Sequence, residues 1–108
     1  RGIYQATKKI VDSMFAGQGK SFKQAVLVEF PRMNMYTIAF VTGFPNGEIQ
    51  SKIGKDFVSV YVPTTPNPTS GYFIMIAKEE VIYLDMSVEE ALTLVISTGI
   101  VNPDDRTK

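Results

Sequence analysis

The residues with the clearest capacity for chemistry lie in a short segment that is interrupted by Pro63, Pro66 and Pro68. Proline fixes φ and has no N–H, so neither a helix nor an inner strand runs through such a segment, and we expect a stiff loop. Its polar groups are hydroxyls, one side-chain amide and backbone donors, which can together cradle an anion. The residues that offer them are Thr64, Thr65, Asn67, Thr69, Ser70 and Gly71.

A second interpretation assigns the same polar groups to the loop itself. Anion sites in proteins usually add a lysine or the start of a helix, and neither is adjacent in the sequence. Asn, Ser and Thr side chains commonly bond the backbone of their own loop. The sequence therefore favours a structural loop, with an anion site as the alternative.

Elsewhere in the chain, the sequence gives little indication of a catalytic site or a metal site. It has neither cysteine nor histidine, which excludes thiolate nucleophiles and disulfides and removes the commonest general base and transition-metal ligand. The carboxylates Glu79, Glu80 and Asp85 show no metal-ligand spacing, and Glu89 and Glu90 have a sufficient role at a helix start. We predict no catalytic residue, no metal site, no cofactor and no enzymatic activity.

The charge of the chain is balanced overall but unevenly placed. The formal net charge is zero, which provides no general attraction for nucleic acid, and we predict no nucleic-acid partner. Residues 1–60 carry eight Lys/Arg against four Asp/Glu, whereas residues 61–108 carry three against seven. The basic excess near the N-terminus is typical of a solvated surface; an acidic partner or anionic lipid is the alternative.

The elements that position the loop have the patterns of strands, with a helix at each end. Strands are predicted over residues 25–30, 36–42, 57–62, 72–77 and 81–84, with a weaker strand over 48–53. Residues 25–30 are apolar on both faces, which is typical of a central strand. Short connections predict one hairpin from the first two strands and another from 72–77 and 81–84.

The N-terminal helix is predicted from a one-sided apolar pattern over residues 3–15, ending near Gly17 and Gly19. Its apolar stripe suits packing on the core, and a helix on a membrane surface is the alternative.

The C-terminal helix begins with a capping box, in which Ser87 and Glu90 bond each other's backbone amides. Gly99 suits the position just past its end, with Ile100 folding back on Val95. The apolar stripe consists of Val88, Ala91, Leu92, Val95 and Ile96.

These elements predict an α+β fold, a mainly antiparallel sheet of about five strands covered by the N-terminal and C-terminal helices. A small, partly closed β-barrel with flanking helices is the alternative, and the strand order stays open. No apolar run reaches the length of a membrane span, so residues 1–108 are expected to form a single soluble domain. The chain begins at Arg1 without a methionine, and we expect it to be part of a longer protein.

Five blocks of the sequence, spread over nearly the whole chain, resemble one family. They are residues 3–4 (IY), 26–32 (VLVEFPR), 39–43 (AFVTG), 58–71 (VSVYVPTTPNPTSG) and 84–91 (LDMSVEEA). The chain resembles domain of unknown function 502, which includes the plant continuous-vascular-ring (COV, LIKE-COV) proteins. The resemblance implies an integral membrane parent whose hydrophobic spans precede this domain, and no established activity to carry over.

The resemblance also implies a setting for the basic N-terminal residues Arg1, Lys8 and Lys9. They would follow the last membrane span, where cationic residues mark the cytoplasmic side and meet anionic head groups. We therefore expect a membrane-associated domain on the cytoplasmic side that binds a protein partner or another copy of itself. A sensor for an anion, a phosphate or a lipid head group is the alternative.

Overall fold

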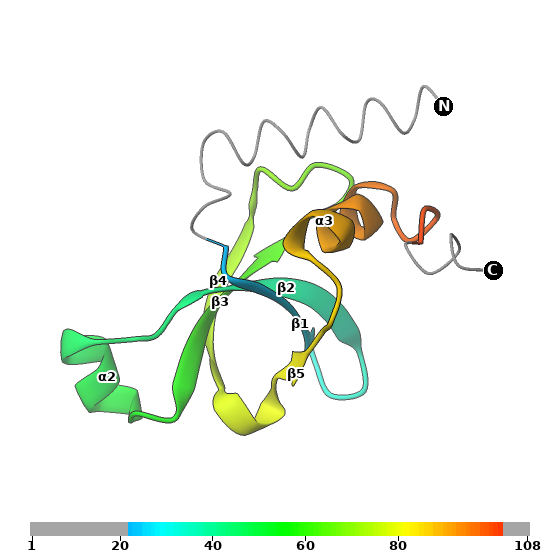
Figure 1. The fold of residues 1–108 in the computed structure, drawn as a ribbon. Coiled ribbons are helices and arrows are strands. Elements are labelled where there is room, and N and C mark those ends of the chain that lie inside the picture. Colours follow the sequence, from blue (N-terminus) through cyan, green and yellow to red (C-terminus); the bar gives the residue numbers. More distant parts are fainter. Residues whose placement is uncertain (1–21, 103–108) are drawn as a thin grey trace.

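The computed structural model describes residues 22–102 and contains one curved antiparallel sheet of five strands with two helices (Figure 1). The predicted α+β class is confirmed, and the sheet does not close into a barrel. The predicted N-terminal helix over residues 3–15 lies outside the described residues. In chain order the elements are β1 Gln24–Glu29, β2 Tyr36–Gly43, α2 Gly47–Ile53, β3 Phe57–Pro63, β4 Gly71–Ala77, the 3-10 helix η2 Lys78–Glu80, β5 Ile82–Tyr83 and α3 Val88–Ile96.

The sheet has the strand order β4-β3-β2-β1-β5, with every neighbouring pair antiparallel. The predicted hairpin of the first two strands is confirmed, with Gln24 opposite Val41 and Glu29 opposite Tyr36. The strand that is apolar on both faces, β1, is internal as predicted, because β2 and β5 flank it.

The predicted hairpin between residues 72–77 and 81–84 is wrong. β4 pairs with β3 and β5 pairs with β1, so these two strands occupy opposite edges of the sheet. Residues 78–81 alone join them, and Lys78–Glu80 form a 3-10 turn instead of a hairpin turn. The hairpin prediction is wrong because a short connection requires only that the two strands lie near each other in space. Curvature of the sheet brings β4 and β5 close together without pairing them.

The short connection requires the sheet to curl. In a flat sheet of five strands the edges would be roughly 19 Å apart, whereas a three-residue 3-10 turn advances only about 6 Å. The rings of Phe30, just after β1, and Tyr72, in β4, lie 5.2 Å apart between centroids although β2 and β3 separate their strands. These rings therefore face each other across the inside of the curve.

Each face of the sheet has its own apolar core, as alternation along the strands requires. On the inner face, seven buried residues are joined by Phe30, Ile74, Ile76 and Val81; the seven are Val26, Val28, Ala39, Val41, Val58, Val60 and Val62. On the outer face, Phe22, Ala25 and Phe40 pack against Ala91, Leu92 and Ile96 of α3. Thus α3 covers the outer face, as the predicted C-terminal helix should.

The weak strand predicted over residues 48–53 is wrong, because Gly47–Ile53 form the helix α2. Glu48 lies in its first turn and Lys52 in its last, the arrangement that suits the helix dipole, and Gly54 with φ of 104° ends it. No α2 residue is buried. This helix projects from the sheet between β2 and β3 (Figure 1).

The start of α3 confirms the predicted capping box. The Ser87 hydroxyl accepts from the Glu90 amide at 3.0 Å, and the Glu90 carboxylate accepts from the Ser87 amide at 3.1 Å. At the other end, Thr98 and Gly99 both have positive φ, and the Gly99 amide donates to the Leu94 carbonyl. Ile100 is 80% exposed, so its predicted packing on Val95 is wrong. The turn after Gly99 directs this side chain into solvent.

Candidate functional site

The loop over residues 63–71, here called the proline loop, holds all six residues that the sequence singled out. Most of their polar groups bond the loop itself. The Thr64 hydroxyl lies 2.7 Å from the Asn67 carbonyl oxygen and 3.0 Å from the Ser70 hydroxyl. The Thr64 amide donates to the Ser70 carbonyl at 2.9 Å.

Asn67 organises the turn at the tip of the proline loop. Its side-chain carbonyl oxygen accepts from the Thr69 amide at 3.2 Å and from the Thr69 hydroxyl at 2.7 Å. This is the local bonding by which Asn shapes loops. The Asn67 oxygen, already the acceptor of two bonds, belongs to the structure of the loop.

The hydroxyls of Tyr61 and Thr65 tie the proline loop to the rest of the fold. The Tyr61 hydroxyl of β3 lies 2.6 Å from the Pro68 carbonyl oxygen and 2.7 Å from that of Ser70. The Thr65 hydroxyl donates to the Val95 carbonyl in the last turn of α3. Pro68 is fully buried. The loop is thus fastened between the sheet and the helix that covers it.

Burial raises the pKa of the Tyr61 phenol above its ordinary value of 10.0. Loss of water around a group disfavours its charged form, and a phenolate would face the two carbonyl oxygens of the loop. Tyr61 is therefore held as a neutral hydrogen-bond donor, a structural use of its hydroxyl.

Gly71 closes the proline loop because no side chain fits there. A Cβ at this position would lie 2.1 Å from the Val62 carbonyl oxygen and 2.8 Å from Tyr61 Cε1. The first of these atoms is backbone and cannot swing away. Gly71 is thus required by close approach of the two strands.

The geometry of the proline loop supports the structural interpretation and does not favour the anion cradle. Its hydroxyls and its side-chain amide oxygen point at one another and at α3. The basic residues Arg1, Lys8 and Lys9 lie outside the described residues.

A different surface is open for binding, at the free edge of β4. Strand β4 lies at one end of the sheet order, and its outer edge meets no other strand among residues 22–102. Tyr72 is 57% exposed and Phe73 is 64% exposed. Together with Met75, these residues place exposed or half-buried apolar side chains along a strand whose outer edge is unpaired within the described residues. We call residues 71–77 with their outward backbone groups the β4 edge.

The direction of the backbone groups in β4 follows from its pairing with β3. The Thr64 amide bonds the Ser70 carbonyl and the Lys78 amide bonds the Asp56 carbonyl, so even-numbered β4 residues exchange hydrogen bonds with β3. The odd-numbered residues direct their N–H and C=O groups away from β3. These residues are Gly71, Phe73, Met75 and Ala77.

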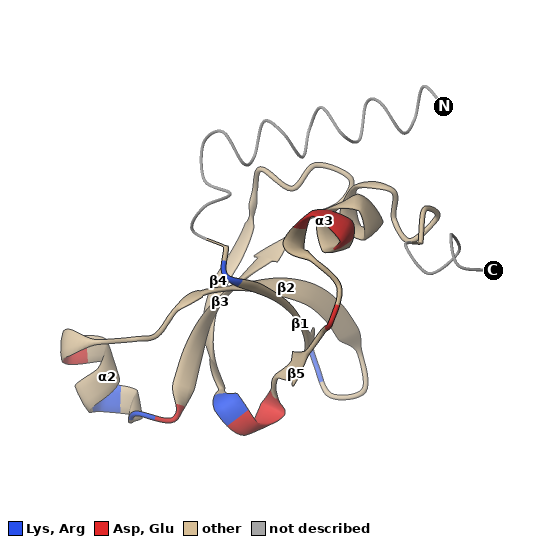
Figure 2. Cartoon of the chain, in the orientation of Figure 1, with Lys and Arg blue, Asp and Glu red and all other residues tan. Residues whose placement is uncertain are grey.

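The β4 edge lacks the features that usually protect an edge strand. It contains no charged residue, proline or interruption of its pairing with β3, and Figure 2 shows the strand without charge along its length. Proteins generally protect free edges with such residues or cover them. By contrast, β5 has only two residues and presents a short edge. The long and uncharged edge is therefore on the β4 side.

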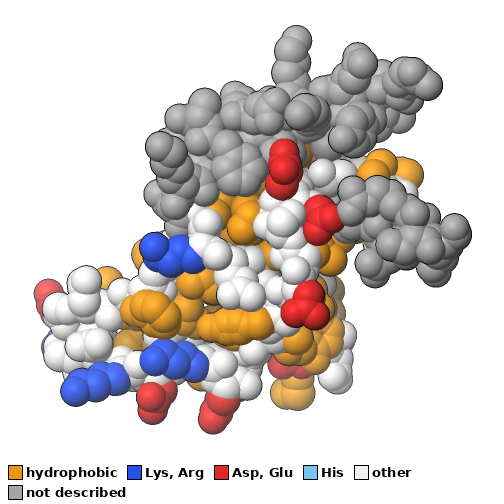
Figure 3. Space-filling view, in the orientation of Figure 1, with side chains coloured by type: hydrophobic (Ala, Val, Ile, Leu, Met, Phe, Trp, Pro, Cys, Tyr) orange, Lys and Arg blue, Asp and Glu red, His pale blue; other side chains and the backbone are white. Residues whose placement is uncertain are grey.

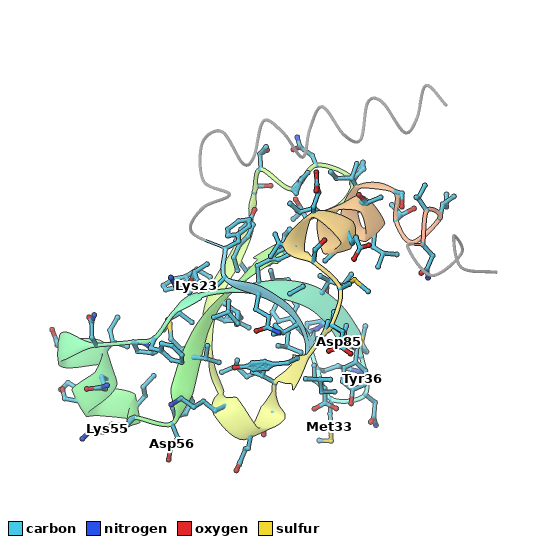
Figure 4. The ribbon with its side chains drawn as sticks, viewed as in Figure 1. Lys23, Met33, Tyr36, Lys55, Asp56 and Asp85 are labelled. Carbon is cyan, nitrogen blue, oxygen red and sulfur yellow. The ribbon has the colours of Figure 1, made fainter. Side chains whose placement is uncertain are left out.

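Exposed apolar side chains also occur away from β4. Figure 3 shows apolar side chains across one face of the molecule with charged side chains around them. Near α2, Phe44 is 57% exposed and the Lys78 ammonium lies 5.2 Å from the centre of its ring. Figure 4 places Met33 and Tyr36 at the β1–β2 hairpin, away from Lys55 and Asp56 beside α2. These side chains do not lie along a long strand with a free edge.

The described residues give no metal or membrane-spanning feature. Residues 22–102 contain no cluster of three or more His, Cys, Asp or Glu side chains that could hold a metal ion. Within the same range, every helix is too short or too polar to cross a membrane.

Sequence patterns do not identify the β4 edge as a binding surface. They predict that residues 72–77 form a strand paired with the strand that follows it, which would cover this edge. The strand order decides the question, and no local pattern encodes it. The lack of charge over seven residues is the one visible signal.

Comparison with known proteins places this α+β domain in a family without an assigned activity. The family model described as "Protein of unknown function (DUF502)" matches residues 1–70, and the chain belongs to this family. The match ends within the proline loop, so β4 and α3 lie beyond it.

Curated relatives extend the likeness to nearly the whole chain. Protein LIKE COV 2 of Arabidopsis thaliana is 29% identical over 103 residues, covering 94% of this chain and 38% of that protein. Protein CONTINUOUS VASCULAR RING 1 of the same plant is 28% identical, covering 95% of this chain and 38% of that protein. The chain thus spans less than two fifths of these relatives. No solved structure matches the chain.

Proposed function

We propose that this domain is a non-enzymatic binding module that takes up another polypeptide at the β4 edge. The observation that carries the proposal is an uncharged strand of seven residues whose outer edge meets no other strand among residues 22–102, together with the exposed ring of Phe73. An extended polypeptide added to such an edge gains backbone hydrogen bonds, and its alternate side chains contact those of the edge strand.

The rigidity of the surroundings supports this proposal. β4 exchanges hydrogen bonds with β3 along its whole length, and Gly71 joins it to the fastened proline loop. A binding surface that is already ordered loses little conformational entropy when a partner arrives. The proline loop acts here as a support for the start of β4.

The test uses the full chain with a photoreactive phenylalanine in place of Phe73, made in cells that produce the protein. Phe44 is the matched control, because it is the same residue type with a similar exposed fraction, 57% against 64%. We expect an adduct with a polypeptide at position 73 and little at position 44. Absence of an adduct at 73, or equal yields at both positions, would count against the proposal.

We further propose that the domain is tethered beside a membrane on its cytoplasmic side. The support is its membership of a family whose relatives extend well beyond it, together with the basic residues Arg1, Lys8 and Lys9. Protease protection of the full-length protein in sealed vesicles tests this. Digestion of the domain from the cytoplasmic face is expected, and protection there would contradict the proposal.

A further inference from the structure

We propose that the polypeptide bound at the β4 edge is a second copy of this chain, paired β4 to β4 in antiparallel orientation. This inference rests on the proposed binding function and names its partner. The two copies would be related by a two-fold axis that passes beside Ile74, the central residue of β4. Two curved sheets would thereby join into one continuous sheet.

The backbone of β4 fits this arrangement along its whole length. With Ile74 opposite Ile74 of the second copy, Phe73 lies opposite Met75 and Gly71 lies opposite Ala77. All of these opposed residues other than Ile74 direct N–H and C=O groups outward. Because residues in hydrogen-bonded pairs exchange two bonds, the edges together form about eight backbone hydrogen bonds.

The side chains that meet in this register are complementary. Tyr72 lies opposite Ile76, an aromatic and β-branched pair of the kind that stabilises antiparallel strands. Phe73 lies opposite Met75, which brings a thioether beside an aromatic ring. The small residues Gly71 and Ala77 lie at the two ends. Each of these pairs occurs twice around the two-fold axis.

The charges next to β4 are also compatible with self-pairing. The strand itself carries none, so no like charges oppose each other within it. Beyond its end, Lys78 of one copy lies opposite Ser70 of the other, and Glu79 lies opposite Thr69. A two-fold axis usually endangers pairing by setting identical charges against each other. This register sets every nearby charge against a neutral residue.

A single-cysteine experiment tests the register directly, because the chain contains no cysteine of its own. In the full chain, Ile74→Cys places two thiols in a non-hydrogen-bonded pair, whose Cα separation of about 4.5 Å falls within the disulfide range. Phe73→Cys is the matched control one residue away, since its thiols would lie diagonally. Tyr36→Cys reports random collision from an exposed position.

We expect mild oxidation to give disulfide-linked dimer from Ile74→Cys roughly tenfold faster than from either control. Equal rates for all three variants would overturn the proposal. Circular dichroism of each variant establishes that it is folded before oxidation. This check matters for Ile74, whose side chain contacts the inner core.

A second measurement leaves the inner core unchanged, because it introduces opposite charges at two positions on the outer face of the sheet. Phe73→Lys and Met75→Glu should each be monomeric by sedimentation velocity, because a dimer of either variant would place its two like charges at diagonally neighbouring positions within the paired strands. Mixed together, they should restore dimer, because the introduced charges oppose each other in the proposed register. A dimer in both separate variants, or none in the mixture, would overturn it.

These outcomes distinguish this inference from the binding function on which it rests. An adduct between position 73 and a different polypeptide, without disulfide dimer from Ile74→Cys, removes the second copy and retains the binding module. Absence of both products removes the two proposals together.

Discussion

Tyr61 and Gly71 each hold the proline loop through a single atomic feature, a phenolic hydroxyl in one case and the missing Cβ in the other. The hydroxyl reaches the carbonyl oxygens of Pro68 and Ser70. The missing Cβ leaves room for the Val62 carbonyl oxygen. These two positions should therefore be far less tolerant of change than the polar residues at the loop's tip.

Gly71→Ala should destabilise the fold by about 2 kcal/mol or more, because the added Cβ collides with backbone and the strands must separate. The free energy of unfolding from urea titration measures the effect. Thr69→Ala, two residues earlier, serves as the control and should cost no more than about 1 kcal/mol. Equal losses for the two variants would contradict a steric requirement at Gly71.

Tyr61→Phe should lower stability by about 1 to 2 kcal/mol near neutral pH, because the Pro68 carbonyl loses the hydroxyl donor, whereas the Ser70 carbonyl keeps the Thr64 amide. The same variant should reduce the loss of stability in alkali. Burial raises the pKa of Tyr61 in the folded protein, so its contribution is complete below pH 10.0 and disappears as pH rises through the folded pKa.

Urea titrations near pH 8 and pH 11 of wild type, Tyr61→Phe and the exposed control Tyr83→Phe separate these effects. The fall in unfolding free energy between the two pH values should shrink only in Tyr61→Phe. An identical fall in all three proteins would contradict the assignment.

Helices α2 and α3 differ in the interactions that stabilise them. α3 has a capping box at its start and four buried residues, Ala91, Leu92, Val95 and Ile96. α2 has seven residues, and none of them is buried. Its stability depends on the favourable charges of Glu48 in its first turn and Lys52 in its last. Since packing of an apolar face supplies most helix stability in proteins, α3 should be the more persistent helix.

Ser87→Ala should lower the stability of the domain by about 1 kcal/mol, since the Glu90 amide loses its acceptor and the first turn frays. Thermal unfolding followed by far-ultraviolet circular dichroism measures the loss. Thr93→Ala is the control inside the same helix, because alanine has the higher helix propensity there, and it should be neutral or slightly stabilising. A neutral Ser87→Ala would show that the cap contributes nothing.

Local sequence patterns predict those elements whose causes are local. The β1–β2 hairpin, the strand β3 and the capping box at Ser87 all follow from short-range alternation or spacing. The strand prediction for residues 48–53 is wrong because their apolar residues are few and the helix-favouring signals, Glu48 and Lys52 at opposite ends, are weak.

The partners of β4 and β5 depend on distant parts of the chain. The two strands are close in sequence and yet bond to opposite edges, because residues 26–27 accept β5 and residues 57–63 accept β4. A pattern of residues along the sequence does not show how the sheet curves. The polar residues of the proline loop can be located from the sequence, and the structure shows that they bond mainly to the loop itself. The β4 edge cannot be found in this way, for the same reason that the strand order cannot.

One sheet separates the two apolar cores of the domain. The outer core joins β1 and β2 to α3, with the Phe22 and Phe40 rings stacked at 5.1 Å. The inner core is dominated by valines and closes across the curve through Phe30 and Tyr72. Loss of either core should unfold the domain, because both use the same central strands.

Phe40→Ala should destabilise the whole domain by about 3 to 5 kcal/mol, since Phe40 is fully buried beneath α3. Phe44→Ala removes the same ring from a position that is 57% exposed, where the ring meets the Lys78 ammonium, and should cost no more than about 1 kcal/mol. Guanidinium unfolding monitored by circular dichroism compares them. Similar midpoints would contradict the assignment of the outer core.

The exposed helix α2 has a consequence for how the chain can be divided. It joins β2 to β3, and none of its residues is buried. The backbone pairing of β2 with β3 involves no residue of α2. A protease cut within Gly47–Ile53 would leave two peptides, one with β1 and β2 and the other with β3, β4, β5 and α3. Interlocked ladders on both sides of the break would hold the peptides together, so the domain should survive as a reconstituted pair of fragments.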